Sequence, residues 1–126
     1  MGSRHKRWIR LCLKLAQKSG APDFKHGAVL VRGGKVIAHG TNNHKKPGYL
    51  ADSLYGEKMW HSETDVLTKV RKERIDGAIL YIAGLSKADN LLCSKPCKCC
   101  SKFIQKFNLK AVYYSDKDGT IIRWAG

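Results

Sequence analysis

The amino-acid sequence predicts an α/β fold with the element order α-β-β-α-β-α-β-β. Three observations carry this prediction. Apolar residues recur with helical spacing in three segments, and short strand-like runs alternate with these segments through the middle of the chain. The turn at 116–119 is too short for a parallel crossover, so the chain ends in an antiparallel hairpin. A length of 126 residues suits one domain, 1–126.

The first half of the chain predicts a helix, a hairpin and a loop. Residues 8–19 form one apolar helical face, which Gly20 and Pro22 end. Residues 1–22 lack acidic side chains, as transit peptides do, but we interpret them as the start of the domain. The runs 28–32 and 35–40 predict strands, because Gly33-Gly34 between them is typical of a tight turn. A polar loop is predicted over 41–60.

The second half predicts two helices and three strands. Residues 61–72 and 97–107 have helical patterns, and 78–83 has the apolar character of a buried strand. The runs 111–115 and 120–124 predict the last two strands. Because a helix separates 78–83 from 111–115, these two strands are predicted to be parallel neighbours.

The composition is strongly basic. Lys and Arg number 24 against 10 Asp and Glu, which gives a net charge of +14 and a pI of about 9.8. Such a surface attracts polyanions or phosphorylated ligands, and solubility alone is the alternative explanation. No apolar stretch approaches the ~18 residues of a transmembrane helix, so we expect no membrane partner.

The cysteines favour a metal site over a disulfide framework. Of five, four cluster at Cys93, Cys97, Cys99 and Cys100. This usage predicts an intracellular, reducing compartment, either cytoplasmic or nuclear.

Two motifs at predicted helix starts carry the chemistry: His61-Ser62-Glu63 and Pro96-Cys97-Lys98-Cys99-Cys100. One helical turn brings the sulfurs of Cys97 and Cys100 to one side, whereas Cys99 points about 100° away from Cys100. With His61 they supply three ligands of a tetrahedral zinc site and leave the fourth position for water, which is the catalytic arrangement.

Glu63 follows the histidine by two residues and can reach the zinc-bound water without being a ligand. We therefore predict that Glu63 is the catalytic proton shuttle. The combined pattern H-x-E, then P-C-x-x-C about thirty residues later, is that of zinc nucleobase deaminases. Two alternatives are a redox C-x-x-C motif and a closed zinc site in which Cys93 or Cys99 is the fourth ligand and Glu63 is incidental.

The chain resembles the cytidine deaminase superfamily over about residues 8–124. Besides the two motifs, the resemblance rests on His26-Gly27-Ala28-Val29-Leu30-Val31 and Gly40-Thr41-Asn42. It implies a three-layer α-β-α fold around a mixed five-stranded sheet, one catalytic Zn²⁺ between the two helix starts, and hydrolytic deamination. The C-terminal hairpin resembles the nucleoside-deaminase branch, whose members often form dimers or tetramers.

The resemblance also implies a substrate pocket. Asn42 matches a residue that hydrogen-bonds the sugar or base, with capping of a loop as the alternative. Ser62 stands where the family usually has Ala, at a backbone N–H that contacts the base carbonyl. Ser94 and Lys95 are expected at the pocket edge. His26 is expected either to stack on the base or to cap the strand, and Trp60 either to line the pocket or to pack in the core.

Two basic stripes bear on the substrate. The first helix carries Arg7, Arg10, Lys14 and Lys18, and the third carries Lys98, Lys102, Lys106 and Lys110. Like charges four residues apart repel, so binding to phosphates explains the stripes better than a solvated face does. The sequence thus favours cytosine in single-stranded DNA or RNA as substrate. The alternatives are a free cytidine or deoxycytidine nucleotide and a non-catalytic zinc module that binds nucleic acid.

Overall fold

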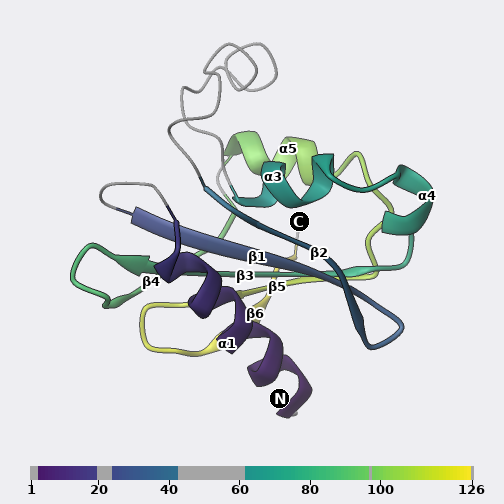
Figure 1. Cartoon of the computed structure of the whole chain (residues 1–126). Coiled ribbons are helices and arrows are strands. Elements are labelled where there is room, and N and C mark those ends of the chain that lie inside the picture. Colours follow the sequence, from purple (N-terminus) through teal and green to yellow (C-terminus); the bar gives the residue numbers. More distant parts are fainter. Residues whose placement is uncertain (1–2, 20–23, 43–61, 97, 126) are drawn as a thin grey trace.

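The computed structural model describes residues 3–19, 24–42, 62–96 and 98–125. Figure 1 shows the whole chain. In chain order, the elements of the described part are α1 (Ser3–Gln17), β1 (Phe24–Arg32), β2 (Lys35–Thr41), α3 (Ser62–Thr68), α4 (Lys72–Ile75), β3 (Ile79–Ser86), β4 (Leu91–Leu92), α5 (Lys98–Ile104), β5 (Ala111–Ser115) and β6 (Ile121–Arg123).

The sheet is mixed and has the strand order β2-β1-β3-β5-β6, with β4 paired to β3. Strands β3 and β5 are parallel neighbours, and β5 and β6 form an antiparallel hairpin, so both predictions are confirmed. All five predicted strands are present as β1, β2, β3, β5 and β6, and the described residues add a sixth strand to the sheet. The additional strand, β4, is two residues long and pairs antiparallel with the end of β3, and so short a segment has no periodicity to detect.

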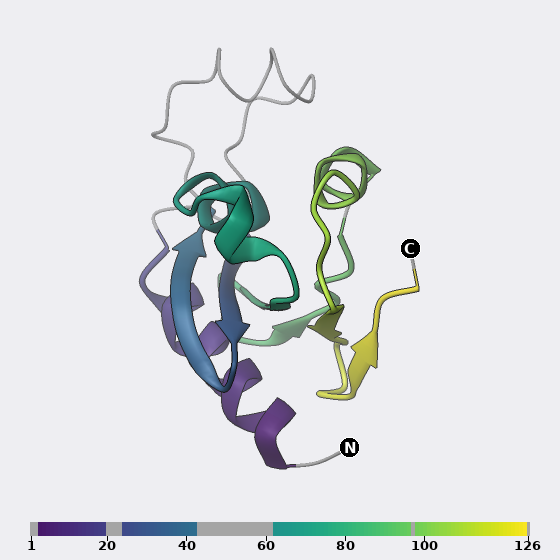
Figure 2. The ribbon, with the colours of Figure 1, turned by 90° about the vertical axis from the view of Figure 1, so that its right-hand side faces the viewer.

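Helices cover both faces of the sheet, as expected for three layers. Figures 1 and 2 show α1 against one face and α3 and α5 against the other. Helix α1 packs on β1 and β3, whereas α3 packs on β2 and β1. None of the helices in the described ranges is both long and apolar enough to cross a bilayer.

Alternation along the central strands builds a core on each face. Ala28 and Leu30 of β1 pack with α3 and α5, whereas Val29 and Val31 pack with α1. Strand β3 is buried on both faces, which explains why its sequence is a continuous apolar run. Helix α1 can lie directly on β1 because Gly27 has no side chain: a Cβ there would overlap the Cys12 carbonyl oxygen.

Two predicted helices extended too far. The helix predicted over 61–72 ends at Thr68 as α3, and a separate short helix, α4, begins only at Lys72. The helix predicted over 97–107 ends at Ile104. After Ile104 the chain makes tighter bonds, from Lys106 N to Phe103 O at 3.1 Å and from Phe107 N to Ile104 O at 3.0 Å. Such bonds between residues three apart close a helix while the apolar pattern continues.

Candidate functional site

The elements that carry the two motifs begin at the same edge of the sheet. Helix α3 precedes β3 and α5 precedes β5, and these two strands are parallel. Because a helix that leads into such a strand runs in the opposite direction, both helices start near the edge at which β3 ends. Strand β1 is antiparallel to both β2 and β3, so β2 also ends there and β1 begins there. The carboxyl ends of strands in open α/β sheets are the usual place for a ligand site.

Glu63 is buried in the first turn of α3. Glu63 is 6% exposed, and the neighbouring Ser62 is 0% exposed. The Ser62 hydroxyl donates a hydrogen bond to Glu63 Oε1 across 2.7 Å. A buried carboxylate held in this way can carry a proton to or from a reacting group, provided that the group comes within hydrogen-bond distance.

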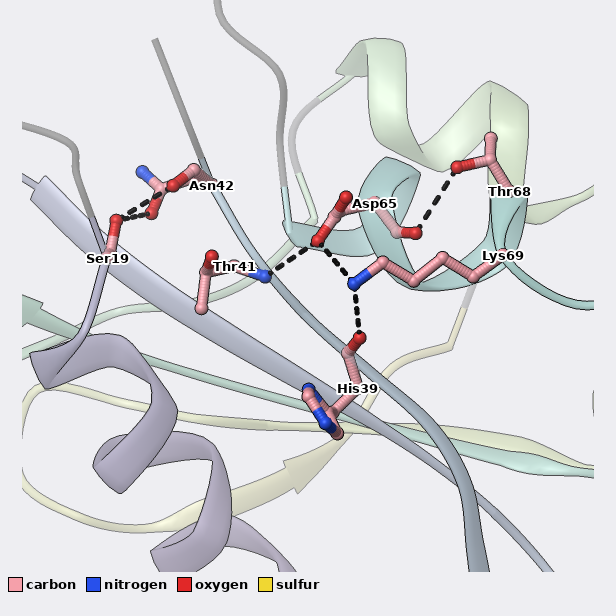
Figure 3. Close-up of polar contacts among 7 residues, drawn as sticks. All are labelled: Ser19, His39, Thr41, Asn42, Asp65, Thr68 and Lys69. Atoms are coloured by element: carbon pink, nitrogen blue, oxygen red, sulfur yellow. Dashed lines mark hydrogen bonds and ion pairs between the residues drawn. The ribbon is translucent and has the colours of Figure 1, made fainter. Parts of the chain in front are cut away.

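Asp65 fastens the first turn of α3 to the end of β2. Figure 3 shows its Oδ2 atom accepting from the Thr41 backbone N–H and from Lys69 Nζ, both at 3.1 Å. Lys69 Nζ also donates to the His39 carbonyl oxygen at 2.9 Å. Sequence reasoning missed this anchor, although the Asp65–Lys69 spacing of four residues is typical of a helical ion pair.

Asn42 joins α1, β1 and β2 through its side chain and is 3% exposed. Its Oδ1 atom accepts from the Ser19 hydroxyl at 2.7 Å and from the His26 backbone N–H at 2.8 Å. Its amide group donates to the Phe24 carbonyl oxygen at 2.7 Å. The contact with Ser19 is drawn in Figure 3. These hydrogen bonds are the ones expected if Asn42 caps a loop, which was the predicted alternative to a substrate contact. Ser19 was not identified from the sequence.

His26 and Ser94 meet above Gly84, as the contacts of this glycine indicate. A Cβ at Gly84 would lie 2.6 Å from His26 Nε2 and 3.0 Å from Ser94 Oγ. The Ser94 backbone N–H donates to the Ser115 carbonyl oxygen at 2.9 Å, which ties this segment to the end of β5. The side chain of Lys95, the next residue, is exposed. The structure therefore brings the predicted pocket residues His26, Ser94 and Lys95 to one edge of the sheet.

Several predicted site residues lie outside the described part of the chain. They are His61, Cys97 and Trp60, together with the side chains of Cys100 and Lys98. Their neighbours are described: α3 starts at Ser62 and α5 at Lys98, and these two helices pack against each other. Among the described side chains, no group of three or more His, Cys, Asp or Glu could hold a metal ion.

The two basic stripes lie on opposite sides of the sheet. Arg7, Arg10 and Lys14 are exposed on α1 and Lys18 directly after it. Lys102 is exposed on α5, Lys106 just after its end, and Lys110 directly before β5. Since α1 and α5 cover opposite faces of the sheet, the stripes do not form one surface (Figure 2). Trp8 is 6% exposed and belongs to the core under α1, so it offers no free stacking face.

One comparison with known proteins identifies a family. The model of the family described as "Cytidine and deoxycytidylate deaminase zinc-binding region" matches residues 2–116. A comparison with curated proteins gives no match.

Three solved structures illustrate the structural likeness. The dCMP deaminase of cyanophage S-TIM5, in complex with dCMP and dUMP, has a TM-score of 0.68 and 25% identity, over 92% of this chain and 83% of that one. The cytidine deaminase of Mycobacterium leprae has a TM-score of 0.59 and 14% identity, over 94% and 91%. RibD of Acinetobacter baumannii has a TM-score of 0.64 and 21% identity, over 90% of this chain but only 28% of that protein. The last two likenesses concern the fold alone.

Proposed function

The chain belongs to the cytidine and deoxycytidylate deaminase family, and from this premise we propose that it removes the exocyclic amino group of cytosine in a free nucleotide such as dCMP. Membership makes the chain a hydrolytic deaminase that acts on a C–N bond. The observation that carries the proposed chemistry is the buried carboxylate of Glu63 in the first turn of α3, two residues after His61.

A zinc ion is implied by the description of the family. His61, Cys97 and Cys100 would hold it. In the sequence His61 directly precedes α3 and Cys97 directly precedes α5, which contains Cys100, and these two helices pack together. One imidazole and two thiolates fit zinc and leave a position for water, as catalytic zinc sites require. When bound, the metal supplies Lewis-acid activation of water near neutral pH.

Glu63 would move the protons of the reaction. It takes a proton from the water that adds to C4 of cytosine and delivers it to the ring nitrogen. It then transfers the second proton of that water to the amino group, which leaves as ammonia. The balance is one water consumed, one ammonia released and uracil formed, with Glu63 returned to its starting state.

Lys95 supports a phosphorylated substrate. It is exposed beside buried Ser94, at the edge of the sheet where Glu63 lies. A single phosphate needs only one or two cations, and the structure of the cyanophage relative was determined with dCMP and dUMP. The proposal therefore needs no contribution from α1, whose cations face the other layer of the fold.

A second candidate substrate is cytosine in single-stranded DNA or RNA. The observation that favours it is the exposed row of Lys102 and Lys106, on and just after α5, which covers the same face of the sheet as α3 and its Glu63. A strand that followed this row would bind with a salt dependence that grows with each neutralised phosphate. Its unpaired bases would need no extrusion from a duplex.

The test of the proposed function is a substrate panel followed by mass spectrometry. Deoxycytidine, dCMP and cytosine-containing single-stranded DNA and RNA are incubated with the zinc-loaded protein. Lys95→Gln should raise KM for dCMP by about tenfold and leave KM for deoxycytidine unchanged, since one charged contact is worth on the order of 1.5 kcal/mol. Lys87→Gln, in the exposed turn between β3 and β4, is the matched control and should behave as wild type.

The outcome discriminates between the two candidates. Turnover of dCMP with the predicted effect of Lys95→Gln supports the free nucleotide. Turnover of the oligonucleotide alone, weakened by Lys102→Glu with Lys106→Glu but not by Arg10→Glu with Lys14→Glu, establishes the polymer instead. If no cytosine compound is converted, the proposed reaction is wrong.

A further inference from the structure

The hydroxyl of Ser62 has a role that the family pattern does not supply. The cytidine deaminase pattern usually places Ala at this position, and Ala has no polar side-chain atom. In this chain the Ser62 hydroxyl lies 2.7 Å from Glu63 Oε1 and donates to it. We propose that Ser62 is a positioning residue, which holds the Glu63 carboxylate in the orientation needed for proton transfer. The inference rests on the proposed role of Glu63.

Burial makes this hydrogen bond consequential. Ser62 is 0% exposed and Glu63 is 6% exposed, so water has little access to either partner. A hydrogen bond to a charged group in such a place is stronger than its equivalent at the surface. In the described part of the chain Glu63 forms no ion pair, so the contact that holds its carboxylate there is the neutral hydroxyl of Ser62.

The contact also restricts the conformation of Glu63. A glutamate side chain has three rotatable bonds, and fixing it costs conformational entropy. The bond from Ser62 engages Oε1, so the carboxylate is oriented and Oε2 lies outside this contact. The first turn of α3 is itself fixed to β2 through Asp65 and the Thr41 backbone N–H. Backbone and carboxylate are therefore held by separate contacts.

Ser62→Ala removes the donor while keeping the helix. If the hydroxyl orients Glu63, kcat for cytosine deamination falls by about 10-fold to 100-fold, as expected for loss of a charged hydrogen bond. KM stays within about twofold of wild type, because the carboxylate acts in the chemical step. Ser62→Thr retains the hydroxyl and restores most of kcat.

Ser115→Ala is the matched control. Ser115 is 1% exposed, and its hydroxyl has no hydrogen-bond partner among the described residues. The same atom is removed from an equally buried serine, so kcat should be unchanged. The midpoint temperature of thermal unfolding is measured for every variant. All rates are then measured at one temperature below the lowest of these midpoints, so that every variant is folded. Ser62→Gly, which a helix start tolerates, replaces Ser62→Ala if the latter does not fold.

Two further comparisons isolate the mechanism. In a Glu63→Ala background, Ser62→Ala should lower the residual rate no further, because the hydroxyl acts through the carboxylate. The inference is overturned if Ser62→Ala keeps wild-type kcat or changes only KM. It is also overturned if folded Ser62→Thr fails to recover activity, or if the losses of kcat caused by Ser62→Ala and Glu63→Ala multiply in the double variant. Glu63→Ala with wild-type turnover would instead overturn the proposed role of Glu63, so the two failures are distinguishable.

Discussion

Asn42 offers a direct test of how the edge of the site is assembled. The change is Asn42→Ala, which leaves the backbone in place and removes all side-chain bonds to its neighbours. The His26 N–H and the Phe24 carbonyl each lose a partner, at 2.8 and 2.7 Å. The Ser19 hydroxyl loses one of two contacts, since it also donates to the Asn42 carbonyl oxygen at 2.8 Å.

The magnitude follows from these lost bonds. Each backbone group left without a partner in a partly buried place costs roughly 1–2 kcal/mol, so Asn42→Ala should lower the free energy of unfolding by about 2–4 kcal/mol. Asn42→Asp keeps the acceptor for His26 but sets an oxygen against the Phe24 carbonyl. It should therefore also destabilise the fold.

Urea unfolding with linear extrapolation measures this difference. Asn108→Ala, at an exposed asparagine, is the control and should change the free energy of unfolding by less than about 0.5 kcal/mol. An Asn42→Ala protein as stable as the Asn108→Ala protein would refute the anchoring role. A raised KM without loss of stability would favour the substrate contact that the family resemblance implies.

Three further predictions concern other parts of the fold. Gly84→Ala forces a methyl group against the His26 ring and the Ser94 hydroxyl, and should lower the free energy of unfolding by about 1–3 kcal/mol; an unchanged urea midpoint would contradict the close packing. Exposed Cys93 should be alkylated by iodoacetamide in the folded protein, whereas Cys12, which is buried and whose pKa burial raises, should react only after unfolding. Peptide mapping of native protein labelled at Cys12 would disprove this. Burial also raises the pKa of Tyr81 from 10.0 to about 12, so the folded state holds this proton more tightly than the unfolded chain does, and stability is lost as pH rises from 10 towards 12. Urea titrations across that pH range should show a smaller loss in the free energy of unfolding for Tyr81→Phe than for wild type. Equal losses in the two proteins would contradict the prediction.

Part of the strand arrangement was predictable from local patterns. The helical face of α1 and the Gly33-Gly34 turn between β1 and β2 are set by local residues, and the short turn at 116–119 forces an antiparallel ending. Strand β4, at Leu91–Leu92, was not predictable, because its pairing depends on β3 and not on its own pattern.

The site was predictable as a set of motifs but not as a set of contacts. The two motifs predict Glu63 and the candidate zinc ligands from their spacing and from the deaminase pattern, and the structure describes Glu63 at the start of α3. One partner of Asn42, in contrast, is Ser19, which lies 23 residues away and has no local signal. Likewise, the lysine patterns indicate exposed helix faces but not which face of the sheet each helix covers. That separation depends on the complete topology.

In the proposed reaction, Glu63 carries the protons in zinc-dependent deamination of cytosine. The direct measurement is the rate of conversion of dCMP to dUMP by wild type and Glu63→Ala, with the zinc content of both proteins determined by elemental analysis. About one zinc per chain is expected in each protein, with a loss of about 100-fold to 10,000-fold in kcat for the variant. Equal turnover by a zinc-loaded Glu63→Ala protein, or no turnover of cytosine by the zinc-loaded wild type, would contradict the proposed reaction.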